Sequence, residues 1–252
     1  MADVAGFAEW MRFLETRHLA DLTFPEVSRA LRALSSAYVE RRQKLPAGAA
    51  LDGAGKRAAF GLFYGPLHFL LVRHIVDSVP ELTAVMGDIV DLGCGTGAAG
   101  AAWATACAHA VSVQGVDRHP WAVEEARETY RLFGLRNRTR VEDLAKVTLP
   151  DRSAVVAAFA INELSAAARD RLLPRLIGHA EHGGRVLIVE PLAGFVAPWW
   201  AAWQRAFQSS GGRANEWRTR ATLPAIVEKL DRAAGLNHRE LTGRSLLLQL
   251  RG

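Results

Sequence analysis

A short glycine-rich stretch carries the clearest chemical signal in the sequence. Residues 88–100 read DIVDLGCGTGAAG, an apolar run that ends in an acid and is followed by closely spaced glycines. Such glycines let the backbone turn sharply and approach a ligand, and the amides that open the next helix attract anionic groups. The glycines fit G-x-G-x-G from Gly93 to Gly97 and G-x-G-x-x-G from Gly95 to Gly100. Both patterns predict a cofactor loop, and the glycines alone do not identify the cofactor.

Two acidic residues further along the chain help to identify it. Asp117 ends the next expected strand, where a carboxylate can accept hydrogen bonds from both hydroxyls of a ribose, a device that NAD enzymes use as well. Asp143 follows the third expected strand and suits an acceptor for an adenine amino group, which an NAD enzyme does not need. The full set of residues predicted to contact the cofactor is Asp91, Gly93, Cys94, Gly95, Gly97, Asp117, Arg118, Asp143, Leu144 and Asn162.

The segment DLGCGTG, opened by Asp91, resembles the acidic-x-G-x-G-x-G first motif of class I S-adenosylmethionine (SAM) methyltransferases. The end of the chain supports this resemblance, because two antiparallel strands are expected there and a simple dinucleotide-binding half lacks them. The resemblance implies SAM as cofactor, S-adenosylhomocysteine as product and methyl transfer as the reaction. NAD or FAD binding, and glycines that only shape a tight turn, are the alternatives.

The catalytic candidates follow the fourth expected strand. Ligands of an open parallel sheet bind outside the carboxyl ends of its strands, which places Asn162 and Glu163 beside the transferred methyl group. Asn162 could orient a substrate amino or hydroxyl group, and Glu163 could accept its proton. Alternatively, Asn162 caps a turn and Glu163 favours the start of the next helix through its charge. Methylation at C5 of a pyrimidine is disfavoured because no cysteine follows residue 107.

A second set of residues could bind the substrate. Trp199 and Trp200 could stack on a base or another aromatic substrate, although a tryptophan stripe at helical spacing more often packs in its own domain. Glu190 ends the fifth expected strand and either shapes the pocket floor or only terminates the strand. Tyr64 and His68, together with Arg73 and His74, could close the pocket from an N-terminal helix, or be structural.

Short apolar runs alternate with helical patterns from about residue 84 onward, which predicts a doubly wound, mostly parallel α/β sheet with an antiparallel last strand. Strands are expected at 87–93, 111–117, 139–144, 153–162, 185–191, 238–241 and 245–250. The last two are joined by three residues, too few for a parallel crossover, so we expect them to pair as an antiparallel hairpin. Helices are expected at 98–110, 120–134, 165–184 and 222–236.

The first 83 residues read as helical, with helices expected at 24–42 and 56–79 and a bend at Gly65–Pro66. We therefore predict two parts, an N-terminal helical cap or substrate-recognition segment at 1–83 and a seven-stranded SAM-binding domain at 84–252.

A closer resemblance runs from about residue 34 to the end. The segments LSSAYVERR, KRAAFGLFYGPLHFLLVRHIV, AFAINELS, VLIVEPLAGF and GLNHRELTGRSLLL resemble the methyltransferase-like proteins associated with the small ribosomal subunit in mitochondria and bacteria. The resemblance implies methylation of ribosomal RNA, or a role in small-subunit assembly. Mitochondrial members carry extra cysteines for an iron–sulfur cluster, and Cys94 and Cys107 alone cannot hold one of that kind, so none is expected.

Composition limits the other possibilities. The chain has 252 residues, of which 50% are hydrophobic, and a formal net charge of +5. The two cysteines are too few for a disulfide framework, and no secretory signal or membrane span is recognised, so we expect a cytoplasmic protein without a membrane partner. The stretch RLFGLRNRTR is either a solvated helix end and loop or a patch that faces phosphates.

Three functions remain open from the sequence. The leading hypothesis is a SAM-dependent methyltransferase that acts at a nitrogen or oxygen of RNA. Small-subunit ribosomal RNA is the first candidate for this RNA. The second is a small-molecule N- or O-methyltransferase with the N-terminal helices as a lid. The third is a non-catalytic ribosome-assembly factor that binds SAM. No metal site is expected.

Overall fold

The computed structural model describes residues 4–40, 51–85, 87–109, 111–193 and 197–249. A seven-stranded sheet with the order β3-β2-β1-β4-β5-β7-β6 forms its centre. The first five strands are parallel, and β7 is antiparallel to both of its neighbours. The strands are β1 (Asp88–Leu92), β2 (Ser112–Asp117), β3 (Arg136–Val141), β4 (Ala154–Ala158), β5 (Arg185–Glu190), β6 (Arg213–Thr219) and β7 (Leu241–Leu248). The predicted fold class is confirmed.

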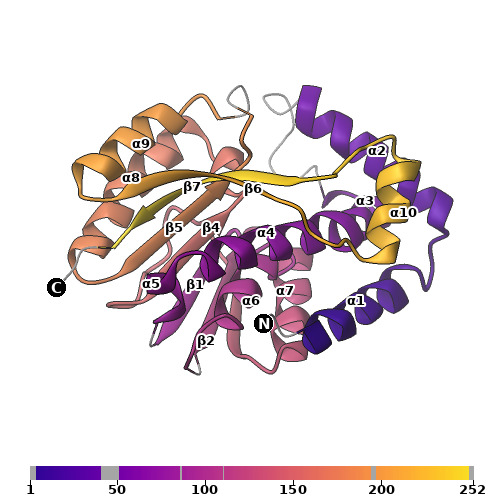
Figure 1. Ribbon diagram of the computed structural model, residues 1–252, viewed down its shortest axis with the longest axis horizontal. Helices are drawn as coiled ribbons and strands as arrows, with labels where there is room; N and C mark the ends of the chain where they lie inside the picture. Colours follow the sequence, from indigo (N-terminus) through magenta and orange to yellow (C-terminus); the bar gives the residue numbers. More distant parts are fainter. Residues whose placement is uncertain (1–3, 41–50, 86, 110, 194–196, 250–252) are drawn as a thin grey trace.

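Helices cover both faces of the sheet, and a further group of helices lies beside its carboxyl edge (Figure 1). The helices are α1 (Val4–His18), α2 (Phe24–Glu40), α3 (Ala54–Ala59), α4 (Gly65–Asp77), α5 (Pro80–Thr83), α6 (Ala98–Ala104), α7 (Pro120–Leu132), α8 (Ala166–Glu181), α9 (Trp200–Ser209) and α10 (Ala225–Ala233). Helices α4, α6 and α7 contribute to the buried apolar cluster on one face, and α8 and α9 to that on the other. The last residues of the helix expected at 24–42 fall outside the described part.

The N-terminal helices pack directly against the sheet domain. The Trp10 indole donates to the Thr129 hydroxyl at 3.0 Å, and His18 and Arg17 both reach the buried Glu125 carboxylate on α7. These contacts fix α1 against α7. Whether residues 1–83 act as a separate recognition unit stays a prediction.

The hairpin expected at the end of the chain is wrong. Leu241–Leu248 is one continuous strand, β7, and its second antiparallel partner is β6, a strand at 213–219 that the sequence did not predict. Gly243 lies inside β7, where an added Cβ would be 2.8 Å from a Leu71 side-chain atom on α4. The glycine therefore allows close packing between strand and helix and does not mark a turn.

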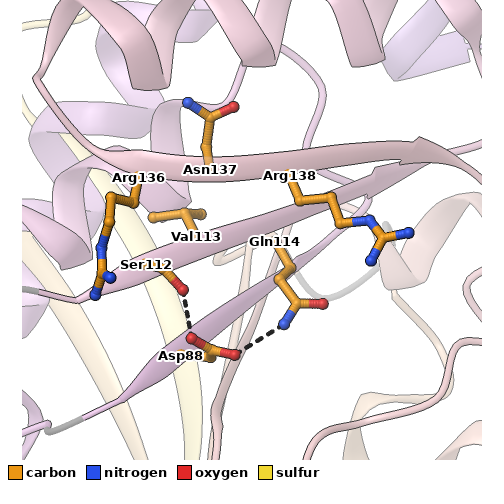
Figure 2. A pocket seen from close by; sticks show the side chains of 7 residues that line it. All are labelled: Asp88, Ser112, Val113, Gln114, Arg136, Asn137 and Arg138. Carbon is orange, nitrogen blue, oxygen red and sulfur yellow. Dashed lines mark hydrogen bonds between the residues drawn. The ribbon is translucent and has the colours of Figure 1, made fainter.

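The third strand begins earlier than expected, at Arg136 instead of residue 139. The second half of the arginine-rich stretch, residues 136–140, is thus part of an edge strand, and its first half is a helix end followed by a turn. No helix follows β3: residues 142–153 reach β4 through turns. Among the described residues, no helix lies over the amino ends of β2 and β3 on the face opposite α7 (Figure 2).

Residues 54–77 form one helical stretch in which a π-helical turn, Phe60–Tyr64, joins α3 to α4. Pro66 occupies the first turn of α4 and directly follows the π turn, so the helix changes its hydrogen-bonding pattern where the proline donates no N–H. By length and composition this stretch could cross a membrane, but 67% of its most apolar window is buried inside the protein. Packing in the core accounts for its apolar character.

Candidate active site

The glycine loop connects the end of β1 to the start of α6 with an unusual backbone. Gly93, Gly95 and Gly97 all have positive φ, at 71°, 51° and 77°, a region that side chains disfavour. The amides of Gly93 and Cys94 donate to the Val116 carbonyl on β2 at 2.8 and 3.0 Å. The loop is therefore tied to the neighbouring strand and begins α6 at Gly97.

Close packing gives a second reason for these glycines. A Cβ added at Gly93 would be 2.4 Å from the Ala160 Cβ, and one at Gly97 would be 2.9 Å from the Ala126 Cα. Ala160 follows β4, so the glycine loop touches the start of the predicted catalytic segment. Any larger residue at Gly93 would displace one segment or the other.

Asp91 is the buried acid that precedes the loop. One of its carboxylate oxygens, Oδ2, accepts hydrogen bonds from the Gly100 amide and the Tyr130 hydroxyl, each at 2.8 Å. The other, Oδ1, is buried without a hydrogen-bond partner among the described residues. Burial raises the pKa of Asp91 to about 6, against the opposing effect of the two hydrogen bonds. Asp91 thus holds the start of α6 and keeps one acceptor free.

Asp117 ends β2 next to the loop. Its carboxylate accepts the Gly95 amide at 3.1 Å and the His119 amide at 2.8 Å, which leaves further lone pairs on both oxygens. Burial raises its pKa. Arg118, the next residue, forms an ion pair with Glu163 at 3.6 Å and so links the ends of β2 and β4.

Asp143 and Leu144 lie in the turn after β3. The Asp143 carboxylate accepts a hydrogen bond from the Ala145 amide at 3.0 Å and is half exposed. The Leu144 side chain is buried, and it contacts the position that a Cβ at Gly93 would occupy. Apart from Asn162, which follows β4, the residues predicted to bind SAM thus gather at the carboxyl edge of β1, β2 and β3.

This donor set fits SAM. The amides at the start of α6 suit the methionine carboxylate, Asp117 keeps lone pairs for ribose hydroxyls, and Asp143 offers an acceptor near the third strand. The free Oδ1 of Asp91 is a buried anionic acceptor of the kind that a cationic group or an ordered water satisfies.

Asn162 is held on three sides just beyond β4, in a short 3₁₀ turn (Ile161–Glu163). Its backbone amide donates to Glu190 at 3.2 Å, and its side-chain amide also donates to Glu190. Its Oδ1 accepts the Trp199 indole N–H at 2.8 Å. These contacts fix the orientation of the Asn162 amide, as a residue that positions a substrate requires.

Glu190 and Trp200 are both buried, and Glu190 contacts Asn162. Glu190 is 0% exposed, and its cross-strand neighbour Arg244 on β7 is 9% exposed. The Arg244 guanidinium lies 4.2 Å from the Trp200 ring centroid and has two buried nitrogens without a hydrogen bond. Glu190 thus supports Asn162, and Trp200 is buried against Arg244. The substrate-binding role of both residues stays a prediction.

Aromatic side chains from the N-terminal helices reach the same region. His68 stacks on Phe159 with a ring separation of 4.0 Å, and Tyr64 contacts both His68 and Phe60. Phe60 lies 3.3 Å from the Cβ position of Gly95. Phe159, the first residue after β4, has a positive φ of 59°, which is strained for a phenylalanine. Tyr64 and His68 thus belong to an aromatic group that reaches the glycine loop through Phe60, and their role in substrate binding stays a prediction. Phe60 and Phe159 are further candidates in the same group.

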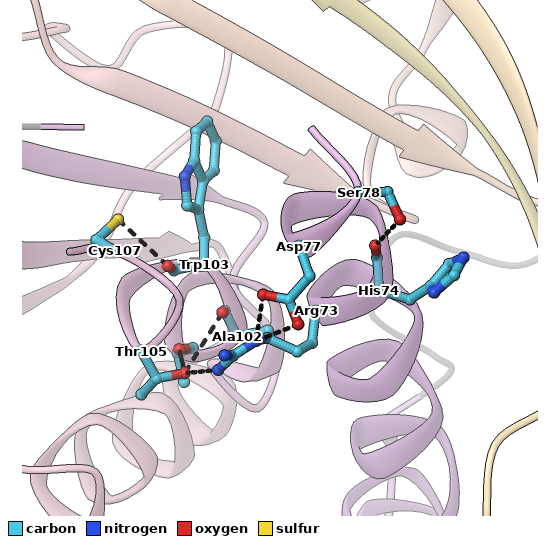
Figure 3. A network of polar contacts seen from close by, with 9 residues as sticks. Arg73, His74, Asp77, Ser78, Ala102, Trp103, Thr105 and Cys107 are labelled. Carbon is cyan, nitrogen blue, oxygen red and sulfur yellow. Dashed lines mark hydrogen bonds and ion pairs between the residues drawn. The ribbon is translucent and has the colours of Figure 1, made fainter. Parts of the chain in front are cut away.

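Arg73 and His74 lie away from this site (Figure 3). Arg73 pairs with Asp77 at 2.9 Å and reaches Thr105 at the end of α6, whereas the glycine loop is at the start of that helix. His74 contacts Trp217 edge-on. Neither residue closes the cofactor pocket.

Cys94 is buried and Cys107 is partly buried, and whether Cys94 contacts the cofactor stays a prediction. Cys94 is buried, and burial raises its pKa well above the ordinary thiol value. Burial also raises the pKa of Cys107 to about 11, beside Trp103 in the same cluster as Arg73 (Figure 3). Within the part of the chain that the structure describes, no group of three or more His, Cys, Asp or Glu side chains could hold a metal ion.

Comparisons with known proteins agree with this geometry. Residues 89–184 match the family model described as methyltransferase domain. A comparison with curated proteins gives no match. A solved structure from Listeria monocytogenes, assigned to the class I SAM-dependent methyltransferases, is 12% identical, with a TM-score of 0.54 over 98% of this chain and 88% of that one. The mitomycin 7-O-methyltransferase MmcR is 15% identical, with a TM-score of 0.50 over 86% of this chain and 60% of its own.

Identities this low establish the fold and leave the substrate open. The match of residues 89–184, the sheet order and the loop geometry together indicate that the chain contains a methyltransferase domain of the class I fold with SAM as its cofactor.

Proposed function

We propose that this methyltransferase acts on RNA, with small-subunit ribosomal RNA as its substrate, at a nitrogen or oxygen atom. The observation that carries the proposal is the fixed Asn162 amide at the end of β4, next to the half-buried aromatic residues Phe159 and His68. An oriented amide can hydrogen-bond the edge of a base, and aromatic rings can stack on its face. The resemblance of several segments to ribosome-associated methyltransferase-like proteins supports the choice of ribosomal RNA.

SAM, when bound, supplies a methyl group already activated on a sulfonium sulfur. The work left to the protein is alignment of the nucleophile and exclusion of water. Asp117, beside the glycine loop, holds the ribose of the cofactor, and Asn162 orients the nucleophilic amino or hydroxyl group of the base. Glu163, next to Asn162 and paired with Arg118, accepts the proton that the nucleophile loses.

Thiolate chemistry at C5 of a pyrimidine does not suit this site. The only two cysteines are Cys94 and Cys107, and burial raises the pKa of both. A thiol that stays protonated at neutral pH is a poor nucleophile. This supports direct transfer to nitrogen or oxygen.

One observation favours a small-molecule substrate as the second candidate. The π turn and α4 place Phe60, Tyr64 and His68 over the glycine loop, as a lid over an apolar pocket would. MmcR, a small-molecule O-methyltransferase by name, shares the fold over 86% of this chain. This candidate needs no contact with phosphates.

The deciding experiment measures transfer of labelled methyl from SAM into two pools. One pool is unmodified small-subunit ribosomal RNA, both naked and in partly assembled particles, and the other is a metabolite extract free of protein. The Asp117→Ala variant serves as the inactive control. Asp21→Ala, which removes the same charge from an exposed turn, serves as the matched control.

We expect label in RNA with the wild-type protein and Asp21→Ala, and none with Asp117→Ala. Label in the metabolite pool alone would overturn the RNA proposal and favour the lid. Binding of SAM without label in either pool would instead favour a non-catalytic assembly factor.

A further inference from the structure

The open face of β2 and β3 differs in kind from the site already described. Strand residues that point to this face are Ser112 and Gln114 on β2 and Arg136 and Arg138 on β3, with Asp88 of β1 at the floor (Figure 2). They line a shallow pocket of about 300 Å³. We call this group of five residues the open face.

The path of the segment after β3 explains why no helix covers the open face among the described residues. The segment after β3 folds back and buries Leu144 and Val147 next to Val116, near the carboxyl end of β2. Arg175 of α8 holds that segment by donating to the carbonyls of Ala145 and Val147. The amino-terminal halves of β2 and β3 lie beyond its reach, and polar residues replace the apolar ones that a covering helix would require.

The open face has a net positive charge, because it holds two arginines and one carboxylate. Arg136 and Arg138 are exposed, and neither forms an ion pair with any described residue. The one carboxylate between them, Asp88, already accepts hydrogen bonds from Ser112 and from Gln114, the latter at 2.9 Å. Arg140, the third arginine on this face of β3, pairs with Glu142 at 3.7 Å. Two unpaired guanidinium groups thus remain.

The spacing of the two arginines suits a chain of phosphates. Residues two apart on a strand point to the same face, roughly 7 Å from each other. Guanidinium groups bind phosphate oxygens through paired hydrogen bonds and stay charged at every physiological pH. A single small anion would occupy one of them, whereas a polyanionic strand would contact both.

We propose that the open face binds the phosphate backbone of the RNA substrate. This inference rests on the proposed RNA methylation and adds a contact outside the catalytic site. β3 leads from Arg136 toward Asp143 at the carboxyl edge, so a strand bound along it reaches the edge where Asn162 and the cofactor loop lie. Phosphate contacts there position the RNA and leave sequence choice to the residues around Asn162.

The test measures binding of a fluorescein-labelled oligouridylate by fluorescence anisotropy, at salt concentrations between about 50 and 200 mM. The variant is Arg136→Ala/Arg138→Ala. Its matched control is Arg12→Ala/Arg232→Ala, which removes two exposed arginines from α1 and α10 and changes the net charge equally. Thermal unfolding and SAM binding are measured for every variant to establish that it folds.

We expect Arg136→Ala/Arg138→Ala to weaken RNA binding about tenfold or more and to flatten the log–log salt dependence by about 1.4, since each contact with single-stranded RNA contributes about 0.7. The control pair keeps the wild-type slope. Arg136→Lys/Arg138→Lys, which retains the charge, restores most of the slope.

Two results overturn the inference and are distinguishable. If the wild-type protein binds and methylates RNA while Arg136→Ala/Arg138→Ala behaves like the control pair, the open face is not the RNA contact and the proposed function stands. If the wild-type protein does not bind RNA at all, the proposed function and the open-face inference fail together.

Discussion

The cofactor loop and the Asn162 cluster lie side by side at the carboxyl edge of the sheet, yet they are built differently. The loop is held by backbone: glycine φ values, amides that donate to the Val116 carbonyl, and the absence of a Cβ at Gly93. The cluster is held by side chains from three distant segments, with Asn162, Glu190 and Trp199 as its members.

The difference reflects what each region must do. The cofactor is the same for every substrate, so a loop fixed by its backbone can serve whatever the substrate is. The substrate varies, and side chains that can be replaced one at a time suit a variable partner. The contact between Gly93 and Ala160 is where the two regions meet, so that contact is the first place to test the account.

Gly93→Ala should produce the largest effect. A Cβ would be 2.4 Å from the Ala160 Cβ at a φ of 71°, so we expect loss of SAM binding and a fall of about 3 kcal/mol in the free energy of unfolding. Calorimetric titration with SAM and urea unfolding measure the two quantities.

Gly134→Ala is the matched control, because its φ is 66° and no atom lies within 4 Å of its Cβ position. Its cost should stay near 1 kcal/mol, with SAM binding unchanged. Adding Ala160→Gly to Gly93→Ala removes the clash and should restore part of the binding. If Gly93→Ala and Gly134→Ala lowered the free energy of unfolding and the SAM affinity equally, the packing contact between Gly93 and Ala160 would have no measurable effect.

The pH dependence of stability should come next in size. The pKa of Asp91 is raised from 3.8 to about 6 in the folded state, so the folded protein binds the proton more tightly than the unfolded chain does. This group therefore adds stability below pH 4 that is lost as the pH rises through 6, about 3 kcal/mol in all.

Asp91→Asn has no charge to bury. We expect the wild type to lose stability between pH 4 and 7, while Asp91→Asn does not lose this contribution. Urea unfolding at several pH values in this range should therefore show the free energy of unfolding of Asp91→Asn rising relative to that of the wild type. A constant difference between the two proteins would contradict the assignment of a buried, charged Asp91.

Asn162→Ala should separate the two regions. Because the Asn162 amide is fixed by Glu190 and Trp199, its loss should lower methyl transfer about 100-fold, while the Kd for SAM changes less than threefold. Rate assays and calorimetry give the two values, and Asn215→Ala on the exposed part of β6 is the control. An equal loss in affinity and rate would make Asn162 part of the cofactor site.

Arg73→Ala should have the smallest effect. Its pair with Asp77 lies at the far end of α6, so we expect a cost below about 1 kcal/mol and unchanged SAM affinity and methyl transfer. A double-mutant cycle with Asp77→Ala measures the pair. A marked loss of SAM affinity in Arg73→Ala would contradict this placement and support the predicted role of Arg73 in closing the cofactor pocket.

The sequence predicted best what depends on local signals. The glycine loop and strands β1, β2, β4 and β5 have apolar runs and turn residues that are informative within a few positions. β6 was missed because its sequence, RANEWRT, is an exposed edge strand with charged residues, and Gly243 was read as a turn because its contact with Leu71 is 172 positions away in the chain.

The candidate site, too, could be predicted from the sequence only where the signal was local. Asn162 was found from its place after an apolar strand, but the roles of Glu190 and Trp199 depend on contacts 28 and 37 residues apart. Phe159 gave no signal because its strained φ arises from the surrounding fold and not from its type. The edge-strand character of Arg136 was likewise hidden, since charged residues rarely indicate a strand.

The central claim is that the edge of β1 and β2 is built to hold SAM, and calorimetric titration of SAM into the wild type, Asp117→Ala and Asp21→Ala tests it most directly. We predict one SAM per chain, affinity lowered at least tenfold by Asp117→Ala, and no change in the exposed control Asp21→Ala. Equal affinity in all three proteins, or no binding to the wild type, would contradict the account.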